Sequence, residues 1–169
     1  MKFTSLIISI SNNNIWPALL LTGIACLILG MEVPTTAAYV ICVSVAGPAL
    51  VDMGLELLQV HLFVFWFALL STITPPVCGT VFIAAGMVNE NWLKVSITSM
   101  SLGIGLYFIP LAMIANKSIL DLNSTLLLSL LAFIKIAFSL VLLSFSIIGN
   151  HFIFIRIAAF FVGLFIMFV

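Results

Sequence analysis

Long, almost entirely apolar stretches constrain this chain more than any other feature of its sequence. They include Leu126–Leu131, Ile136–Leu143 and Ile157–Val169, and none alternates apolar with polar residues as a barrel strand does. Hydrophobic residues make up 64% of the sequence and charged residues 6%, which is far outside the range of soluble domains. Because a bilayer supplies no water to backbone polar groups, these stretches predict helices, whose hydrogen bonds are internal. The predicted fold class is an all-α membrane protein.

The length and charge of the chain limit its partners. Its 169 residues allow about four to six crossing or half-crossing elements, at about 20 residues for a full span. This is small for a complete secondary transporter. Basic and acidic residues balance at five each, which favours neither nucleic acid nor a polybasic contact with lipid headgroups. Partners are therefore expected within the membrane, including its lipid.

The first informative interruption lies at Gly30–Pro34, between an apolar run at Ile15–Leu29 and a second that ends at about Gly47–Pro48. Gly allows unusual backbone angles, and Pro34 lacks an N–H but suits the first turn of a helix. Each arm has about 15 residues, or roughly 22 Å, against a hydrocarbon core of roughly 30 Å. Two arms too short to cross predict a re-entrant hairpin over about 15–47, with its tip near the membrane midplane.

A second interruption follows at Thr74–Pro75–Pro76, where two prolines remove two backbone donors. The flanking apolar runs, Val60–Ile73 and Val77–Val88, fit either one helix broken midway or a second hairpin. We favour a broken helix over about 58–88, because the two halves together are long enough to cross once.

Three conventional spans are predicted in the remainder of the chain. The first covers about 92–115, where Gly103, Gly105 and Pro110 permit close packing or a kink. After a polar loop, two more follow at Leu126–Ile148 and Phe152–Val169. The domain prediction is a transport region over residues 1–115 and two C-terminal transmembrane helices within 116–169.

Lys135 lies near the middle of the predicted span Leu126–Ile148. A central lysine costs about 2.5–3.5 kcal/mol on membrane insertion. We therefore expect Lys135 to face another helix or a water-filled crevice, with Ser139 on the same helix face to help solvate it.

The sequence indicates ion binding rather than catalysis. Each His stands alone, and no nucleophile motif or carboxylate pair is evident, so we do not expect an enzyme. Hydroxyl residues accompany both interruptions, at Gly30–Thr36 and Ser71–Thr80. Unwound backbone at membrane depth frees carbonyls for a hard cation, and an exposed helix N-terminus presents N–H groups to an anion. The alternative is that both are harmless kinks, since Gly and Pro are common in membrane helices.

Three spaced segments carry a family resemblance: Leu29–Tyr39 (LGMEVPTTAAY), His61–Phe65 (HLFVF) and Thr72–Val77 (TITPPV). Together they resemble the large membrane subunit of TRAP transporters, the tripartite ATP-independent periplasmic class. The sequence of Pro34–Tyr39 is most similar to that of the fused permeases of the TAXI subclass. The resemblance covers roughly residues 3 to 115 in order, and it implies the C-terminal part of such a subunit, its second repeat.

The resemblance implies an elevator-type transporter built from two inverted repeats, each with a hairpin and a broken helix. In the second repeat, the hairpin tip and the broken helix face each other around one sodium site. On this sequence the implied metal ligands are the Thr74 hydroxyl and the backbone carbonyls of Gly30, Met31, Thr74, Pro75 and Pro76. Thr35 and Thr36 open the helix after the tip and are the implied substrate-side residues.

The implied function is sodium-coupled import of small organic acids (carboxylates) through the bacterial inner membrane, by a multi-pass permease that works with a periplasmic substrate-binding protein. Sodium is the coupling ion, and no other cofactor is implied.

Two departures from the family pattern qualify the implied function. Glu32 places an acidic group at the tip, and the first repeat is absent, so the first-repeat portion of the permease is an expected partner. Two alternatives stay open: a non-transporting membrane fragment or scaffold, and a small oligomeric channel lined by the polar breaks.

Overall fold

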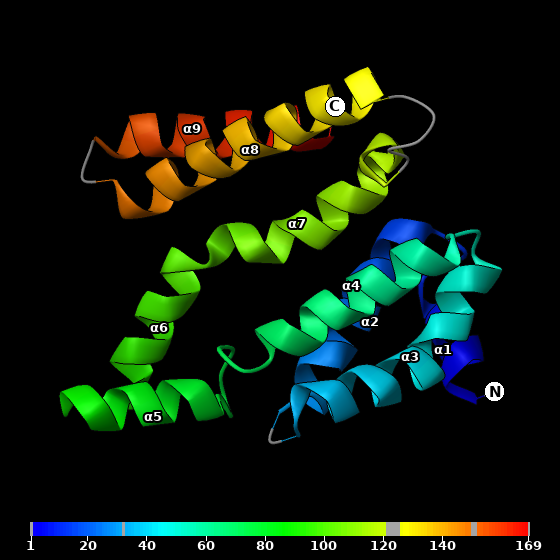
Figure 1. Ribbon diagram of the computed structural model, residues 1–169, viewed down its shortest axis with the longest axis horizontal. Coiled ribbons are helices and arrows are strands. Elements are labelled where there is room, and N and C mark those ends of the chain that lie inside the picture. Colours follow the sequence, from blue (N-terminus) through cyan, green and yellow to red (C-terminus); the bar gives the residue numbers. More distant parts are fainter. Residues whose placement is uncertain (1, 32, 121–125, 150–151, 169) are drawn as a thin grey trace. The chain divides into compact units, whose positions relative to one another are not determined.

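The computed structural model describes residues 2–31, 33–120, 126–149 and 152–168 (Figure 1). In these ranges every regular element is a helix, which confirms the all-helical prediction. The elements are α1 (Lys2–Ile10), α2 (Ile15–Leu29), α3 (Thr35–Asp52), α4 (Leu57–Leu70), α5 (Gly79–Val88), α6 (Trp92–Leu102), α7 (Ile104–Ala115), the 3₁₀ turn η1 (Lys117–Ile119), α8 (Leu126–Ile148) and α9 (Ile153–Phe168).

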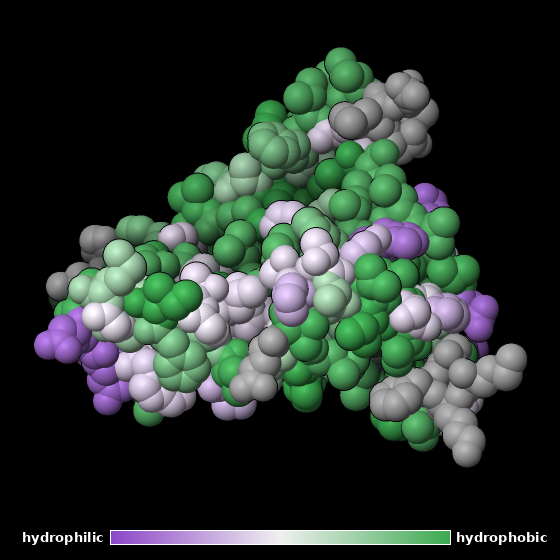
Figure 2. Space-filling view, turned by 60° about the horizontal axis from the view of Figure 1, so that its bottom comes forward, coloured by the Kyte–Doolittle hydropathy of each residue, from purple (hydrophilic) through white to green (hydrophobic). Residues whose placement is uncertain are grey.

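The apolar surface of these helices suits lipid. Among the described residues, α3 and α8 are long and apolar enough to cross a bilayer, and the pair α6 and α7 passes the same test if it counts as one bent span. Leu20, Ile24 and Ile28 follow one another along an exposed stripe of α2. Figure 2 shows hydrophobic residues over most of the visible surface and hydrophilic residues in small patches. Such a surface would be unusual on a soluble monomer.

Residues Met1–Ile97 form one compact unit. Its centre is the set α2, α3 and α4, which pack against one another, with α1 packed on α2 and α3 (Figure 1). The core contains fully buried side chains from all three central helices, including Leu19, Cys26, Cys42, Leu50, Phe63 and Val64. At Gly23 a Cβ would lie 3.1 Å from the Phe67 ring, so this glycine lets α2 approach α4 closely.

A polar contact ties α3 to α4 within the same unit. The Tyr39 hydroxyl lies 2.6 Å from His61 Nδ1, and the Tyr39 ring meets the Phe65 ring edge to face at 5.9 Å. Tyr39 ends the first segment that resembles the transporter family, and His61 begins the second. The fold therefore brings these two segments into direct contact.

The C-terminus of α3 differs from the prediction. We expected the helix to end at about Gly47–Pro48, but it continues through Pro48 to Asp52. A proline inside a helix removes one N–H bond but does not oblige the chain to stop. The end comes at Gly54, whose φ is 93°; the Leu55 N–H bonds to Leu50 O at 3.1 Å and the Gly54 N–H to Val51 O at 2.9 Å. This is a Schellman ending with glycine in the left-handed position.

The length of α3 differs from the arm length that the hairpin prediction assumed. Its 18 residues extend about 27 Å, whereas the 15 residues of α2 extend about 22 Å. Only α2 is clearly too short for a hydrocarbon core of roughly 30 Å.

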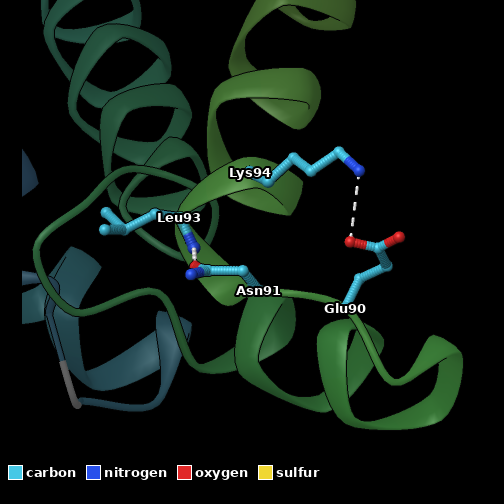
Figure 3. Close-up of polar contacts among 4 residues, drawn as sticks. All are labelled: Glu90, Asn91, Leu93 and Lys94. Atoms are coloured by element: carbon cyan, nitrogen blue, oxygen red, sulfur yellow. Dashed lines mark hydrogen bonds and ion pairs between the residues drawn. The ribbon is translucent and has the colours of Figure 1, made fainter.

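Side chains of the preceding turn fix the start of α6 (Figure 3). Asn91 Oδ1 accepts a hydrogen bond from the Leu93 N–H at 2.9 Å, and Lys94 Nζ lies 3.2 Å from a Glu90 carboxylate oxygen. Both members of the ion pair are exposed, so it adds little stability. The asparagine cap is the part that sets the helix start.

Residues Thr98–Val169 form a second compact unit. In it α7, α8 and α9 pack together around the buried residues Ala112, Ile136, Leu143 and Met167. The span expected over about 92–115 is two helices, α6 and α7, bent by 40° at a break that contains Gly103. A Cβ at Gly163 would meet Leu142 and Leu143 at 3.3 Å, so this glycine lets α9 lie close against α8.

Lys135 has a polar partner on a neighbouring helix end, which confirms that it does not face lipid alone. Its Nζ donates to Asn116 Oδ1 at 2.7 Å. The Asn116 amide nitrogen donates to Ala112 O and Met167 O, each at 3.0 Å, so one side chain links α7, α8 and α9. The prediction that Ser139 helps to solvate Lys135 was wrong, because the Ser139 hydroxyl donates to Gly163 O instead.

We expect Asn116→Ala to lower the free energy of unfolding by about 2 kcal/mol, because it leaves the Lys135 ammonium half-buried without its acceptor. Unfolding in detergent measures this, with exposed Lys117→Ala as the control. In the double variant Asn116→Ala/Lys135→Met the loss should be smaller than the sum of the single losses, because no unpaired charge remains. Additive losses would contradict the coupling.

Candidate functional site

The tip between α2 and α3 is a turn held by few backbone bonds. The Gly30 N–H bonds to Cys26 O at 2.9 Å and the Met31 N–H reaches Ile28 O at 3.4 Å. Pro34 stands at the N-cap of α3, and among the described residues no side chain caps that N-terminus. Glu32, the acidic residue expected at the tip, lies outside the described residues. The first N–H groups of α3 are therefore left without a side-chain acceptor in the described part of the tip.

The break between α4 and α5 is longer than Thr74–Pro75–Pro76. α4 ends at Leu70 and α5 begins at Gly79, so residues 71–78 are not helical. The predicted halves, Val60–Ile73 and Val77–Val88, were thus each too long at the break.

Hydroxyl groups close the C-terminal end of α4 in place of further helix. Ser71 Oγ donates to Ala68 O at 2.7 Å, Thr72 Oγ1 to Leu69 O at 2.8 Å, and Thr74 Oγ1 to Leu70 O at 2.6 Å. The carbonyls of Leu69 and Leu70 also accept backbone bonds from the Thr72 and Ile73 N–H groups, each at 3.2 Å, so the hydroxyl bonds reinforce the end of the helix.

Beyond α4, the break contains backbone oxygens that are not used in the fold. Within the described residues, no hydrogen bond reaches the carbonyls of Thr72, Ile73, Pro75 and Pro76. The peptide between Pro75 and Pro76 is cis. Unpaired carbonyl oxygens are the ligand type that hard cations prefer.

The tip and the break meet in the first unit. A Cβ on Gly30 would lie 2.8 Å from the Ser71 Cβ, so only a glycine fits there without displacing the break. One cavity of about 280 Å³ has walls from both segments, formed by Gly30, Val33, Pro34, Ser71, Thr72, Val77, Gly79 and Thr80. This cavity is the candidate site.

Several of the predicted site residues lie around this cavity rather than in its wall. Gly30 is buried and lines it, and half-buried Met31 follows directly. Thr74 is buried in the break, where its hydroxyl donates to Leu70 O. Thr35 is half-buried and Thr36 exposed at the start of α3, one and two residues beyond Pro34 in the cavity wall.

Sequence reasoning missed Ser71, Thr72 and Thr80, which line the cavity. They fall in the hydroxyl-rich segment Ser71–Thr80, but the two prolines drew the prediction to residues 74–76. The contact between Gly30 and Ser71 depends on how α2 packs against α4, and no local pattern reports that.

Comparisons with known proteins match the part of the chain that holds the site. No curated protein and no solved structure gives a match. The sequence model of one family, described as "Tripartite ATP-independent periplasmic transporter, DctM component", matches residues 1–123, which contain the tip, the break and the cavity. This membrane chain therefore belongs to the DctM component family of tripartite ATP-independent periplasmic transporters.

Proposed function

We propose that the chain is the second-repeat, C-terminal part of a sodium-coupled permease that imports organic acids through the bacterial inner membrane as a multi-pass protein. The family assignment supports a transporter component rather than an enzyme. The sequence of Pro34–Tyr39 supports the fused TAXI type. A component of a tripartite transporter works with other components, which implies a periplasmic binding protein and a small membrane subunit. The first-repeat portion of the permease would complete the transport domain.

The observation that carries the proposal is the cavity shared by the tip and the break. The unpaired carbonyls of the break would give sodium its oxygen ligands, with the Thr74 oxygen and the carbonyls of Gly30 and Met31 beside them. On the tip side, the uncapped N-terminus of α3, with Thr35 and Thr36, suits a substrate carboxylate. A cation and an anion would thus be bound next to each other, each helping to neutralise the other.

An elevator motion follows from the same proposal, because a site bounded by two short elements of one unit can move as a body. The alternatives make different forecasts. A scaffold would leave uptake independent of sodium, and an oligomeric channel would carry ion current without a binding protein.

The sodium site can be tested with Thr74→Ala and Pro76→Ala, in the chain together with the first-repeat portion and the binding protein. The first removes a hydroxyl, and the second restores an N–H that lets the helix close over a carbonyl. Each should raise the sodium concentration for half-maximal uptake about tenfold, the equivalent of about 1.4 kcal/mol. Thr98→Ala and Pro17→Ala, both at exposed positions, are the matched controls.

Initial uptake against sodium, normalised to folded protein, gives the answer. Linkage requires an equal loss of substrate affinity at fixed sodium, while the binding protein's own affinity stays constant. Sodium curves that do not shift in either variant would remove the break from the site.

The contact between tip and break is tested by Gly30→Ala. Its methyl group collides with Ser71, so we expect a loss of about 1–3 kcal/mol in the free energy of unfolding and weaker sodium dependence of uptake. Gly86→Ala is the control, because no atom lies within 4 Å of its Cβ position, and in helix α5 it should stabilise by about 0.5–1 kcal/mol. Equal behaviour of the two variants would mean that tip and break are not in contact.

Re-entry of the hairpin is tested by cysteine labelling with an impermeant reagent. Trp16→Cys and Val51→Cys, exposed near the outer ends of α2 and α3, should react from the same side of the membrane. The native cysteines are fully buried and give little background. Reaction of Trp16→Cys and Val51→Cys from opposite sides of the membrane would contradict the hairpin.

A further inference from the structure

The second unit contains a pocket that the transport proposal does not use. It has a volume of about 330 Å³, lies between the C-terminal end of α8 and the first half of α9, and is lined by Ser146, Ile147, Arg156, Ile157, Phe160 and Phe161, among others. It lies beyond residue 123, where the match to the transporter family ends. Its polar groups are at one end, near the turn that joins the two helices, and its apolar side chains continue along α9.

Arg156 is half-buried at the polar end of this pocket. Its Nε donates to Ser146 O at 2.7 Å and one Nη donates to Ile147 O at 2.8 Å. These carbonyls belong to the last turn of α8, where a positive charge is favourable. One role of Arg156 is therefore to cap α8, and Ser146 Oγ returns a bond to Arg156 O at 2.7 Å.

Capping α8 leaves part of the guanidinium unused. An arginine has five N–H donors, and the two bonds to α8 leave three. Among the residues that the structure describes, no carboxylate or other acceptor meets these three. The sequence has one acidic residue after Glu90, Asp121, and it precedes the N-terminus of α8, whereas Arg156 contacts the C-terminal end. A half-buried cation in a membrane protein without an anion is costly, so an external anion is expected here.

The direction of the pocket identifies the anion. The guanidinium bonds to the last turn of α8, whereas Ile157, Phe160 and Phe161 lie progressively farther along α9. Because α8 is long and apolar enough to cross a bilayer, we expect its end to meet the headgroup layer and the apolar side chains to face the acyl chains. A free anion would use the first part only. A phospholipid would use both, with its phosphate on the planar donors of Arg156 and an acyl chain along the apolar wall.

We infer that this pocket is a binding site for a single phospholipid, whose phosphate pairs with Arg156 and whose acyl chain lies against Ile157, Phe160 and Phe161. The lipid would neutralise the charge of Arg156 and hold the end of α8 against the start of α9.

The test is binding to the full-length chain in detergent, read by native mass spectrometry. The probes are phosphatidylglycerol, diacylglycerol with the same acyl chains, and inorganic phosphate. We expect phosphatidylglycerol to bind at least about tenfold more tightly than diacylglycerol, and inorganic phosphate not to displace it. Displacement by inorganic phosphate, or equal binding of the two lipids, would overturn the proposal.

Variants of the pocket residues test whether the lipid binds at Arg156. Arg156→Gln should weaken phosphatidylglycerol about tenfold without changing diacylglycerol binding, and Arg156→Lys should restore part of the affinity. Ile157→Trp fills the apolar wall and keeps the bonds of Arg156 to α8, so it tests the site even if Arg156→Gln does not fold. Ile155→Trp, exposed on α9 away from the pocket, is the matched control. Unchanged phosphatidylglycerol affinity in Ile157→Trp would show that Arg156 serves only as a helix cap.

Discussion

Hydrogen bonding of the backbone without water is the constraint on which the rest of this structure depends. A helix that ends inside a bilayer leaves carbonyls that need a donor. At the end of α4 the donors are backbone N–H groups together with three hydroxyl groups, from Ser71, Thr72 and Thr74. At the end of α8 they are two N–H groups of Arg156. In both places these donors bond to the carbonyls at the helix end. After α4, the carbonyls without a hydrogen bond lie in the break.

Much of the helical framework could be predicted from apolar runs and from the Gly, Pro and capping residues between them. α2 begins after Asn14, whose side chain caps it, and ends before Gly30; α8 has the bounds expected from its long, mostly apolar sequence. The errors came from proline. At Pro48 the prediction ended α3 too early, because the loss of one N–H was taken as a stop and the glycine at position 54 was overlooked. At Pro75 and Pro76 the prediction kept α4 too long, because the helix ends at Leu70, before the prolines, in the hydroxyl-rich segment that follows.

The candidate site was predictable only in part, for a related reason. Gly30 could be identified locally, since a glycine at the end of an apolar run marks a turn. Its neighbour Ser71 could not, because their approach depends on the packing of α2 against α4. The same distinction applies to Lys135. The sequence predicts that a central lysine needs a polar partner, but the partner is Asn116, which is distant in sequence, and not Ser139 one turn away.

Asn116 also has a consequence for how the second unit is assembled in the membrane. Its amide nitrogen bonds to Met167 O across 51 residues of chain, while its amide oxygen holds Lys135 in the intervening helix. An α7–α8 pair inserted without α9 would therefore lack one of these polar contacts. We expect release of the pair from the insertion machinery to be more favourable once α9 has joined it, so that the three helices insert as one unit.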